Sequence, residues 1–576
     1  MSPDRTNRGD GAPSVPVVPI GVGVLTVAAV FLRWWKLGHQ GLWVDEAYTA
    51  LIANRSFAGI RTALQVDDAP PLFYVFEKPM LAIFGNSEAA VRLFPALCGS
   101  LALLATFVIF RRYAPRATSA ALLVTGFSSL AIFYSQQARS YSLLHLLSVL
   151  SVWTVLRWSD RPTPARALAV VTIALALLYT HNLGVWAVLA ASLTALGGWW
   201  ALGKERGAAK SGLVTLLGAF ALGALPWGWN VLQQIGTHRD LNDWMATWWR
   251  DHPLALAPLF STAVFLNGGL GAIRPPVPAP VIDPTNTAIA AVCLVLRVAV
   301  AAFAVSGIFR ALRPTDRIGR ILTIYSAVPL LGLLLTHVGV GPSYVVGRTD
   351  TIALFPFLLL VGYGWSKLSR PLRTAALSIW VLVCLLPYAP GVGRSVEKGA
   401  DRALAQWLGE HIEPGDALVV AMVGRPTLEY YAERQGWLDR LGSFSTFPPV
   451  GDENPAAVFP TPLDSVDTYR SQARAIRAAW ERTGVSTVWC EGVLLNLEPG
   501  FPSMATVPPP DGRFIDANAL GYPGSILVYT LLGLEPAPVS ARFRRDWMGA
   551  DRVLLAIPRT RWIPVDSLPP VEATTP

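Results

Sequence analysis

Residues 15–48 read VPVVPIGVGVLTVAAVFLRWWKLGHQGLWVDEAY. The run from Val15 to Leu32 is apolar, and about 20 such residues cross a bilayer as a helix. It follows two arginines, but no small-residue cleavage pattern comes after it, as one would in a signal peptide. We therefore predict an uncleaved first span, preceded by a disordered cytoplasmic leader over residues 1–14.

The composition of the 576 residues also indicates a membrane protein. Hydrophobic residues make up 52% and charged residues only 15%, whereas soluble domains carry about 25% charged residues. The net charge of +9 requires that a nucleic-acid-binding protein be considered. A nucleic-acid surface needs basic residues gathered on one face, and here they are spread between apolar runs. An ordinary soluble enzyme and a nucleic-acid-binding protein are therefore both disfavoured.

Ten further runs of mainly apolar residues are long enough to span, which makes eleven predicted transmembrane helices. One more apolar stretch, Leu254 to Leu270, is interpreted as lying on or dipping into the membrane. A full span there would invert every later loop against the charge rule. The ten runs lie near residues 94–110, 119–135, 140–156, 167–183, 185–202, 212–230, 287–309, 321–340, 350–366 and 374–390.

The Lys and Arg residues orient these spans, because short cytoplasmic loops collect basic residues. With the N-terminus in the cytoplasm, five short loops on that side hold sixteen basic residues, whereas the short loops on the other side hold only Arg139 and Arg348. This pattern predicts a multi-pass protein of the plasma (inner) membrane with an extracytoplasmic C-terminal region. The basic loops contain Arg111, Arg112, Arg116, Arg157, Arg161, Arg166, Lys204, Arg206, Lys210, Arg310, Arg313, Arg317, Arg320, Lys367, Arg370 and Arg373.

The chain changes character at about Arg394. In residues 394–576, short apolar runs typical of β-strands alternate with helical stretches, so we predict a soluble extracytoplasmic α/β domain after a membrane domain over residues 15–393. Cys490 is the only cysteine in this region, which excludes a disulfide within it. The expected strands are 417–423, 486–489, 525–531 and 553–557, and the expected helices are 398–411 and 466–482.

The first long extracytoplasmic loop, residues 33–93, concentrates the motifs that carry chemistry. An amphipathic stretch runs from Tyr48 to Leu64. The run from Leu72 to Phe84 is too short to span and contains two charges and a proline, so we expect an interfacial helix there. The motifs are WVDEAY at 43–48, DDAPPLFY at 67–74 and FGNSEAAVRLFP at 84–95.

Six segments, taken in order, resemble the GT-C class of membrane glycosyltransferases. The resemblance is to protein O-mannosyltransferases and the lipid A aminoarabinose transferase, which take sugars from polyprenyl-phosphate donors. It covers roughly residues 15–390 and implies a mainly α, polytopic membrane protein of about 11 transmembrane helices, to which the C-terminal soluble α/β domain is added. The segments are LWVDEAYT (42–49), DDAPPLFY (67–74), FGNSEAAVRLFPAL (84–97), YSQQARSYSL (134–143), LYTHNLG (178–184) and YVVGRTDTIALFP (344–356).

The resemblance implies that an acidic residue of the first external loop is catalytic, and Asp45 matches that position as the general base. Relatives carry His or Lys just before the Pro-Pro pair, whereas Ala69 stands there in this chain. Lys78 replaces that cation only if the interfacial helix turns the right way. Substrate contacts are expected from Glu46, Asp68, Arg139, Tyr141, His181, Tyr344 and Arg348.

The same residues make chemical sense without the resemblance. Transfer from a lipid phosphate to a hydroxyl needs a base for the acceptor proton, which a carboxylate supplies. It also needs a cation for the departing phosphate, and arginine binds phosphate through paired hydrogen bonds. Plainer interpretations stay open: loop carboxylates are solvated or cap helices, Asp67 and Asp68 can begin a turn, and membrane-edge arginines snorkel to lipid headgroups.

We therefore predict a membrane glycosyltransferase that moves a sugar, with inversion, from a polyprenyl-phosphate donor to a hydroxyl of an envelope glycan, lipid or protein. Two alternatives remain: a flippase or transporter of lipid-linked sugars, and a polysaccharide polymerase or ligase. Transporters usually contain repeated halves, which this sequence does not display. Paired acidic residues can hold a divalent cation together with phosphate oxygens, so metal dependence stays open, and no other cofactor is predicted.

Overall fold

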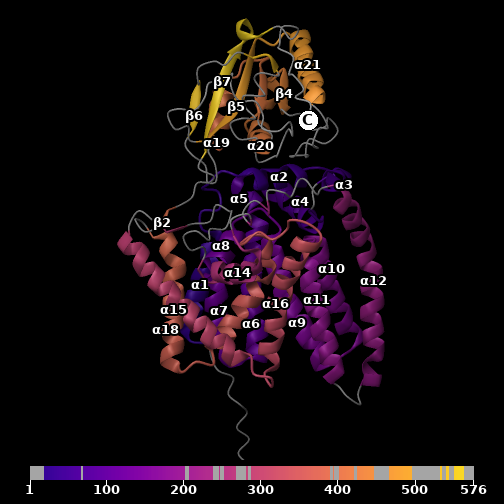
Figure 1. Cartoon of the computed structure of the whole chain (residues 1–576), viewed down its shortest axis with the longest axis vertical. Coiled ribbons are helices and arrows are strands. Elements are labelled where there is room, and N and C mark those ends of the chain that lie inside the picture. The colour runs from indigo at the N-terminus through magenta and orange to yellow at the C-terminus, as the bar shows by residue number, and fades with distance from the viewer. Residues whose placement is uncertain are drawn as a thin grey trace, which may run out of the picture.

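The computed structural model consists of a helical bundle, a layer of short helices at one end of it, and a C-terminal unit above that layer (Figure 1). The structure describes residues 18–66, 69–201, 206–237, 245–246, 249, 252–267, 281–282, 287–389, 393–394, 401–420, 424–446, 466–495, 532–534, 540–543 and 550–563.

Apolar helices stand side by side in the bundle (Figure 1). Their buried faces share one hydrophobic core that reaches from Ala29 in the first helix to Cys384 in the last. The bundle contains α1 (Ile20–Trp34), α6 (Leu93–Tyr113), α7 (Thr118–Phe127), α8 (Ser129–Ser135), α9 (Tyr141–Asp160), α10 (Pro164–Thr180), α11 (Gly184–Ala201), α12 (Arg206–Thr237), α15 (Thr287–Ala311), α16 (Arg317–Gly339), α17 (Leu354–Trp365) and α18 (Arg370–Leu385).

The predicted spans all overlap apolar helices of this bundle. Within the described ranges, five helices are long and apolar enough to cross a membrane, or six if the bent pair α7 and α8 counts as one span. Six shorter apolar helices accompany them. The number of spans that cross the membrane therefore stays a prediction.

The predicted span 119–135 is a broken helix, because α7 and α8 meet at a bend of 61° around Ser128. Such a break leaves carbonyl groups at the end of the first helix without partners inside it. The buried Arg33 guanidinium donates to the carbonyls of Thr125 (3.2 Å) and Gly126 (2.9 Å), and to that of Ala29 (2.7 Å) in its own helix. A cation from α1 therefore caps the broken helix.

A layer of short helices crosses the end of the bundle beneath the C-terminal unit (Figure 1). The amphipathic stretch from Tyr48 folds as two of these helices. The helix expected over 72–84 is confirmed, and it ends at Gly85, whose φ of 80° favours glycine. The layer contains α2 (Val44–Ala53), α3 (Phe57–Val66), α4 (Leu72–Phe84) and α5 (Glu88–Val91).

The apolar stretch that begins at Leu254 forms a turn of 3-10 helix, Leu254–Leu256, and then α14 (Ala257–Asn267). The 11 residues of α14 measure about 17 Å at 1.5 Å per residue, too short for a hydrocarbon layer of about 30 Å. This helix packs against α15, α16 and α17. The interpretation that the segment does not span stays a prediction, because residues 268–270 lie outside the described residues.

The C-terminal unit is built on a five-stranded sheet with the order β4-β3-β5-β7-β6. β3 pairs parallel with β4 and β5, and β7 pairs antiparallel with β5 and β6. Successive residues face opposite sides, so Leu418 packs with α19 and α20, and Val419 with α21. The elements are α19 (Asp401–His411), β3 (Ala417–Val420), α20 (Arg425–Gln435), β4 (Ser443–Thr446), α21 (Val466–Thr483), β5 (Thr487–Leu495), β6 (Ala541–Phe543) and β7 (Ala550–Pro558).

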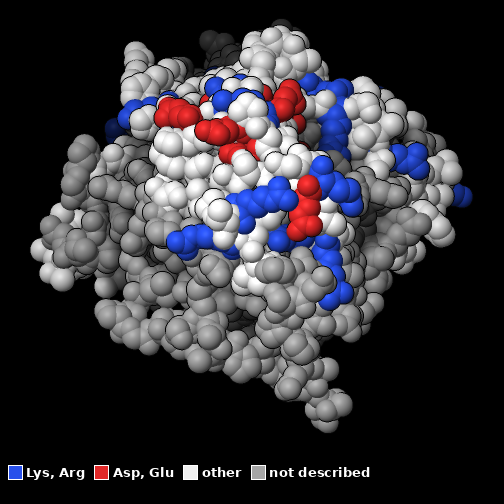
Figure 2. All heavy atoms as spheres, turned by 90° about the horizontal axis from the view of Figure 1, so that it is seen from above, with Lys and Arg blue, Asp and Glu red and all other residues white. Residues whose placement is uncertain are grey.

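Three of the expected strands correspond to β3, β5 and β7, and the expected helices correspond to α19 and α21. The fourth expected strand, 525–531, lies outside the described residues. Helix α20 and strands β4 and β6 were not predicted. Seen from the side of the C-terminal unit, acidic and basic side chains lie close together on one face (Figure 2), a mixed pattern typical of solvated surfaces.

The Arg33 cap generates a stability prediction. Replacing Arg33 with Met leaves the Thr125 and Gly126 carbonyls without their donor in a buried environment, and we expect a loss of about 1–3 kcal/mol. Thermal unfolding in detergent measures it. Lys36→Met is the matched control, because Lys36 is exposed. Equal unfolding temperatures for the two variants would contradict a capping role.

Candidate functional site

The predicted catalytic acid lies where several segments meet at the end of the bundle. Asp45 is in the first turn of α2, and Tyr141 begins α9. His181 lies between α10 and α11, and Arg348 lies in the loop between α16 and α17. Segments from distant parts of the chain thus converge beneath the C-terminal unit.

Asp45 and Arg348 form an ion pair, with 2.8 Å between Oδ2 and the guanidinium. Their side chains remain 19% and 15% exposed, so a ligand can reach both. The Arg348 Nε donates to the Tyr141 hydroxyl (3.3 Å), and the guanidinium lies 6.0 Å from the Trp43 ring centroid. Burial by itself lowers the pKa of Arg348, but the Asp45 carboxylate and the Tyr141 hydroxyl together outweigh this effect and raise the pKa. Arg348 is therefore a permanent cation.

A tight turn positions Arg348 for its ion pair with Asp45. Gly347 has a φ of 74°, a left-handed conformation that favours glycine. Its carbonyl accepts from the Tyr134 hydroxyl, and the Thr349 hydroxyl accepts from the Val345 amide (2.8 Å). The Arg348 amide in turn donates to the Val345 carbonyl (3.0 Å). Because hydrogen bonds hold the backbone on both sides of Arg348, the position of its Cα atom is fixed.

Arg139 and His181 belong to the same cluster. His181 is partly buried, and desolvation together with the charges of Arg139 and Arg348 lowers its pKa to about 4. Arg139 also acts on the pKa of Arg348, which places the two cations near one another. The Nδ1 of His181 accepts from the Leu183 amide (3.2 Å). The neutral imidazole therefore carries its proton on Nε2 and can donate it to an oxygen.

Glu46 has a different environment from its neighbour Asp45. Its carboxylate receives two hydrogen bonds from Arg92, each 2.7 Å, and one from the Ala138 amide (3.0 Å). The side chains of Arg92 and Glu46 are 2% and 0% exposed. The predicted substrate contact of Glu46 remains untested, and this burial favours a structural role.

Arg92 completes this cluster, which we call the Glu46–Arg92 clamp. Its remaining donors reach the carbonyls of Leu37 (2.6 Å), Gln40 (2.9 Å) and Gly41 (2.8 Å). The clamp ties the end of α1 to α2 and to the α8–α9 turn that bears Arg139. Sequence reasoning assigned Arg92 no role, although it is the arginine of the segment FGNSEAAVRLFPAL.

The other predicted residues lie elsewhere. The Tyr344 hydroxyl is bonded to Ser261 of α14 (2.7 Å), so it faces that helix. Asp68 lies outside the described residues, as does Asp67. Lys78 donates to the Arg55 carbonyl (2.6 Å) and is thereby directed to the α2–α3 turn. The structure thus brings together Asp45, Arg139, Tyr141, His181 and Arg348 from the predicted set.

A divalent cation would need several oxygen or nitrogen ligands together. Within the described ranges, no group of three His, Cys, Asp or Glu side chains is placed to hold a metal ion. The carboxylates of Asp45 and Glu46 each face an arginine. Asp67 and Asp68, the other acidic pair of the first loop, fall outside those ranges.

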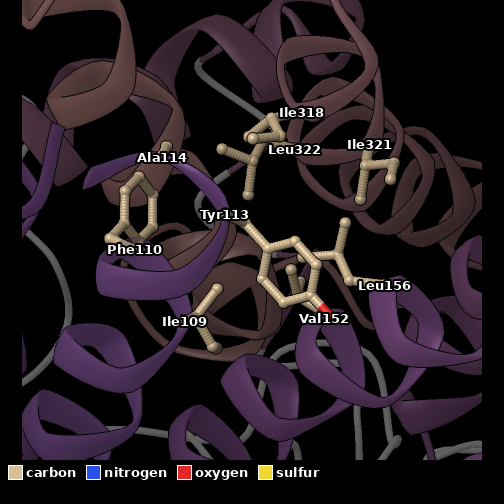
Figure 3. Close-up of a pocket in the computed structure, with 9 residues that line it drawn as sticks. All are labelled: Ile109, Phe110, Tyr113, Ala114, Val152, Leu156, Ile318, Ile321 and Leu322. Carbon is tan, nitrogen blue, oxygen red and sulfur yellow. The ribbon is translucent and has the colours of Figure 1, made fainter. Parts of the chain in front are cut away.

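A small pocket lies at the opposite end of the bundle, between α6, α9 and α16 (Figure 3). The only polar side-chain atom among its lining residues is the Tyr113 hydroxyl, which donates to Asp160 (2.9 Å). None of the lining residues is charged. The lining residues are Ile109, Phe110, Tyr113, Ala114, Val152, Leu156, Ile318, Ile321 and Leu322.

Comparisons with known proteins found one matching family and similar solved structures. Residues 68–229 match the model of a family described as dolichyl-phosphate-mannose-protein mannosyltransferase. The crystal structure of ArnT from Cupriavidus metallidurans bound to undecaprenyl phosphate is similar at 14% identity and a TM-score of 0.50, covering 94% of this chain and 98% of that one. The apo structure of the same protein aligns at 15% identity and a TM-score of 0.40, over 93% and 98% of the chains. No curated protein sequence matches.

The likeness to ArnT concerns the fold, which is that of a multi-pass membrane protein. Together with the family match, it supports a GT-C class membrane glycosyltransferase, as the motifs predict. The matched range 68–229 includes Arg92, Arg139, Tyr141 and His181 of the site.

The clamp generates a second prediction. Replacing Arg92 with Leu leaves a buried carboxylate without its cation, and we expect a loss of about 3–5 kcal/mol in stability. Arg317→Leu is the matched control: its pair with Asp160 is exposed to 44% and 29%, and such pairs contribute about 0–1 kcal/mol. Thermal unfolding in detergent compares the two. Similar losses would contradict the assignment of the clamp.

His181 generates a prediction on pH. Its pKa falls from 6.5 to about 4 on folding, so the unfolded chain binds a proton first as the pH falls. Stability should therefore decrease from pH 6.5 towards about pH 4, and His181→Asn should remove this part of the dependence. Unfolding temperatures over that range measure it, with the exposed His39→Asn as control. Parallel curves for wild type and His181→Asn would contradict the burial of a neutral imidazole.

Proposed function

We propose that this protein transfers a sugar from a polyprenyl-phosphate donor to a hydroxyl acceptor on the extracytoplasmic face of the membrane. The observation that carries the proposal is the Asp45–Arg348 pair at 2.8 Å, with Arg139 and His181 beside it. The family description names a dolichyl-phosphate sugar, and the similar ArnT structure is bound to undecaprenyl phosphate. Both support a lipid-phosphate donor.

The donor phosphate suits the two arginines. The charge of Arg139 lowers the pKa of Arg348, and an anion bound between the two guanidinium groups would relieve this repulsion. Arginine binds phosphate oxygens through paired hydrogen bonds. His181 is neutral near pH 7 because its pKa is about 4, so its Nε2 proton adds a hydrogen-bond donor without a third charge. The polyprenyl tail would stay in the hydrocarbon beside the bundle.

Asp45 would act as the general base. The acceptor hydroxyl gives its proton to the Asp45 carboxylate while its oxygen forms a bond to the anomeric carbon. The bond from that carbon to the phosphate oxygen breaks, and its electron pair leaves with the polyprenyl phosphate. Attack from the face opposite the phosphate inverts the configuration. Arg348 contacts Asp45 now and has further N–H donors for the leaving phosphate.

The surrounding residues would hold this geometry. The Tyr141 hydroxyl accepts from the Nε of Arg348, which orients the guanidinium plane. The Glu46–Arg92 clamp holds the backbone at Asp45 and Arg139 from behind. The extracytoplasmic placement follows from the basic loops, and the C-terminal unit would cover the site or hold the acceptor.

Transfer assays on proteoliposomes test the proposal. With radiolabelled undecaprenyl-phosphate sugars and envelope extract as acceptor source, the wild-type protein should form labelled product. Asp45→Asn should lower the rate by about 100-fold or more, since a general base contributes about 10²–10⁴. Asp160→Asn, at the opposite end of the bundle, is the matched control and should leave the rate unchanged.

Other outcomes would contradict the scheme. Full activity of Asp45→Asn would remove Asp45 as the base. A wild-type protein that binds the donor but does not turn it over would favour a flippase. Turnover of diphosphate-linked donors alone would favour a polymerase or ligase.

A further inference from the structure

The C-terminal unit is packed onto the helix that carries Asp45. α20 lies on α2 at the top of the bundle (Figure 1). One hydrophobic cluster contains Ala47 and Ala50 of α2 together with Leu404 of α19 and Leu428 and Tyr431 of α20. The small alanine side chains let the helices approach closely. The unit therefore shares a core with the layer of short helices.

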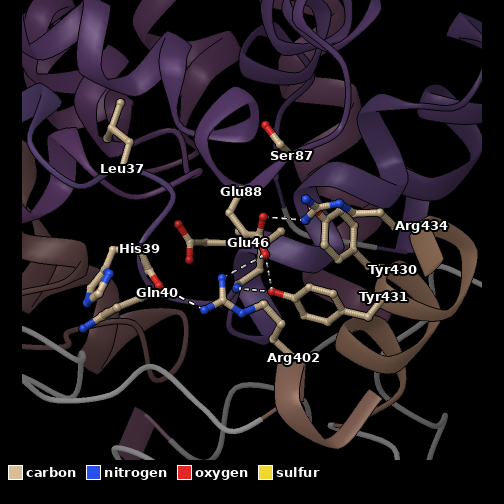
Figure 4. A network of polar contacts seen from close by, with 12 residues as sticks. Leu37, His39, Gln40, Glu46, Ser87, Glu88, Arg402, Tyr430, Tyr431 and Arg434 are labelled. Atoms are coloured by element: carbon tan, nitrogen blue, oxygen red, sulfur yellow. Dashed lines mark hydrogen bonds and ion pairs between the residues drawn. The ribbon is translucent and has the colours of Figure 1, made fainter. Parts of the chain in front are cut away.

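A polar network lies at the edge of this contact (Figure 4). Glu88 of α5 accepts from Arg434, from Arg402 (3.4 Å) and from the Tyr431 hydroxyl (3.3 Å). The same hydroxyl accepts a hydrogen bond from the Leu42 amide (2.8 Å). Because the hydroxyl proton is directed to Glu88, a lone pair faces Leu42. Tyr431 is 1% exposed, so water does not replace this contact.

Leu42 lies close to the site along the chain. Trp43 follows it and precedes the first turn of α2. The Arg348 guanidinium lies over the Trp43 ring, 6.0 Å from the ring centroid, and the Trp43 Nε1 donates to Gln137 (2.8 Å). A displacement of residues 42–43 would move the surface on which Arg348 rests.

We propose that Tyr431 is a positioning residue for the transfer reaction, acting from the C-terminal unit through residues 42–43 on Arg348. The inference rests on the proposed function. Its consequence is that the C-terminal unit helps to assemble the phosphate site, in addition to any role in binding the acceptor.

The test compares two substitutions on one helix. Tyr431→Phe removes the hydroxyl at Leu42, whereas Tyr430→Phe removes a neighbouring buried hydroxyl that donates to the Asn86 carbonyl (2.8 Å). Both remove one hydroxyl between the unit and the first loop, so their unfolding temperatures should fall alike. Tyr431→Phe should lower kcat about 10-fold with little change in the donor KM, because misplacement of a charge acts mainly on the transition state. Tyr430→Phe should retain the wild-type kcat.

Two further measurements test the contact between Tyr431 and residues 41–42 more directly. Hydrogen exchange of the Leu42 amide, followed by mass spectrometry on the full chain, should accelerate in Tyr431→Phe and not in Tyr430→Phe. Gly41→Ala would place a Cβ 3.1 Å from the Tyr431 hydroxyl oxygen, and it should lower kcat without altering α20. The Gly41→Ala result supports the inference even where Tyr431→Phe folds poorly.

If the wild-type enzyme is active and Tyr431→Phe, Tyr430→Phe and Gly41→Ala all have its kcat, the positioning role is overturned. This holds whether or not the variants differ in stability. An inactive wild-type protein would instead overturn the proposed function, and the positioning role would fall with it. Faster exchange in Tyr431→Phe would then still report a contact between the unit and residues 41–43, with a structural role alone.

Discussion

The buried pair between Glu46 and Arg92 is the interaction on which the rest of the site depends. A buried arginine is tolerated when its donors are all engaged, and Arg92 meets this requirement with one carboxylate and three carbonyls. Those carbonyls belong to residues 37–41, so the chain after α1 must wrap around the guanidinium. This wrapping sets where α2 begins, and with it the place of Asp45.

The site in front of the clamp is rich in positive charge. Arg348 faces Asp45, yet Arg139 lies close enough to disfavour a second cation. His181 responds to the same charges and stays neutral. In the proposed function, a lipid phosphate would bind at these arginines and leave the Asp45 carboxylate available for the acceptor proton.

Local patterns predicted the elements well where the signal is strong. Apolar runs located the bundle helices, and the charge and proline within 72–84 indicated a short helix, which α4 is. The break at Ser128 escaped prediction because the Arg33 guanidinium, which caps the broken helix end, lies far away in the sequence. Helix α20 also escaped, since RPTLEYYAERQ has no clear apolar stripe. Its two tyrosines are buried only because α2 and α5 lie against it.

The sequence by itself determined the class of molecule, the apolar helices and the identity of the acidic and basic candidates, because these depend on composition, periodicity and local motifs. The motif also distinguished Asp45, as the expected base, from Glu46, but it gave no physical reason for the difference. Only the tertiary structure decided what surrounds them: one carboxylate is enclosed by Arg92, and the other contacts Arg348 from 303 residues away. Ion pairs of such separation follow from how the helices pack, and no local pattern encodes that packing.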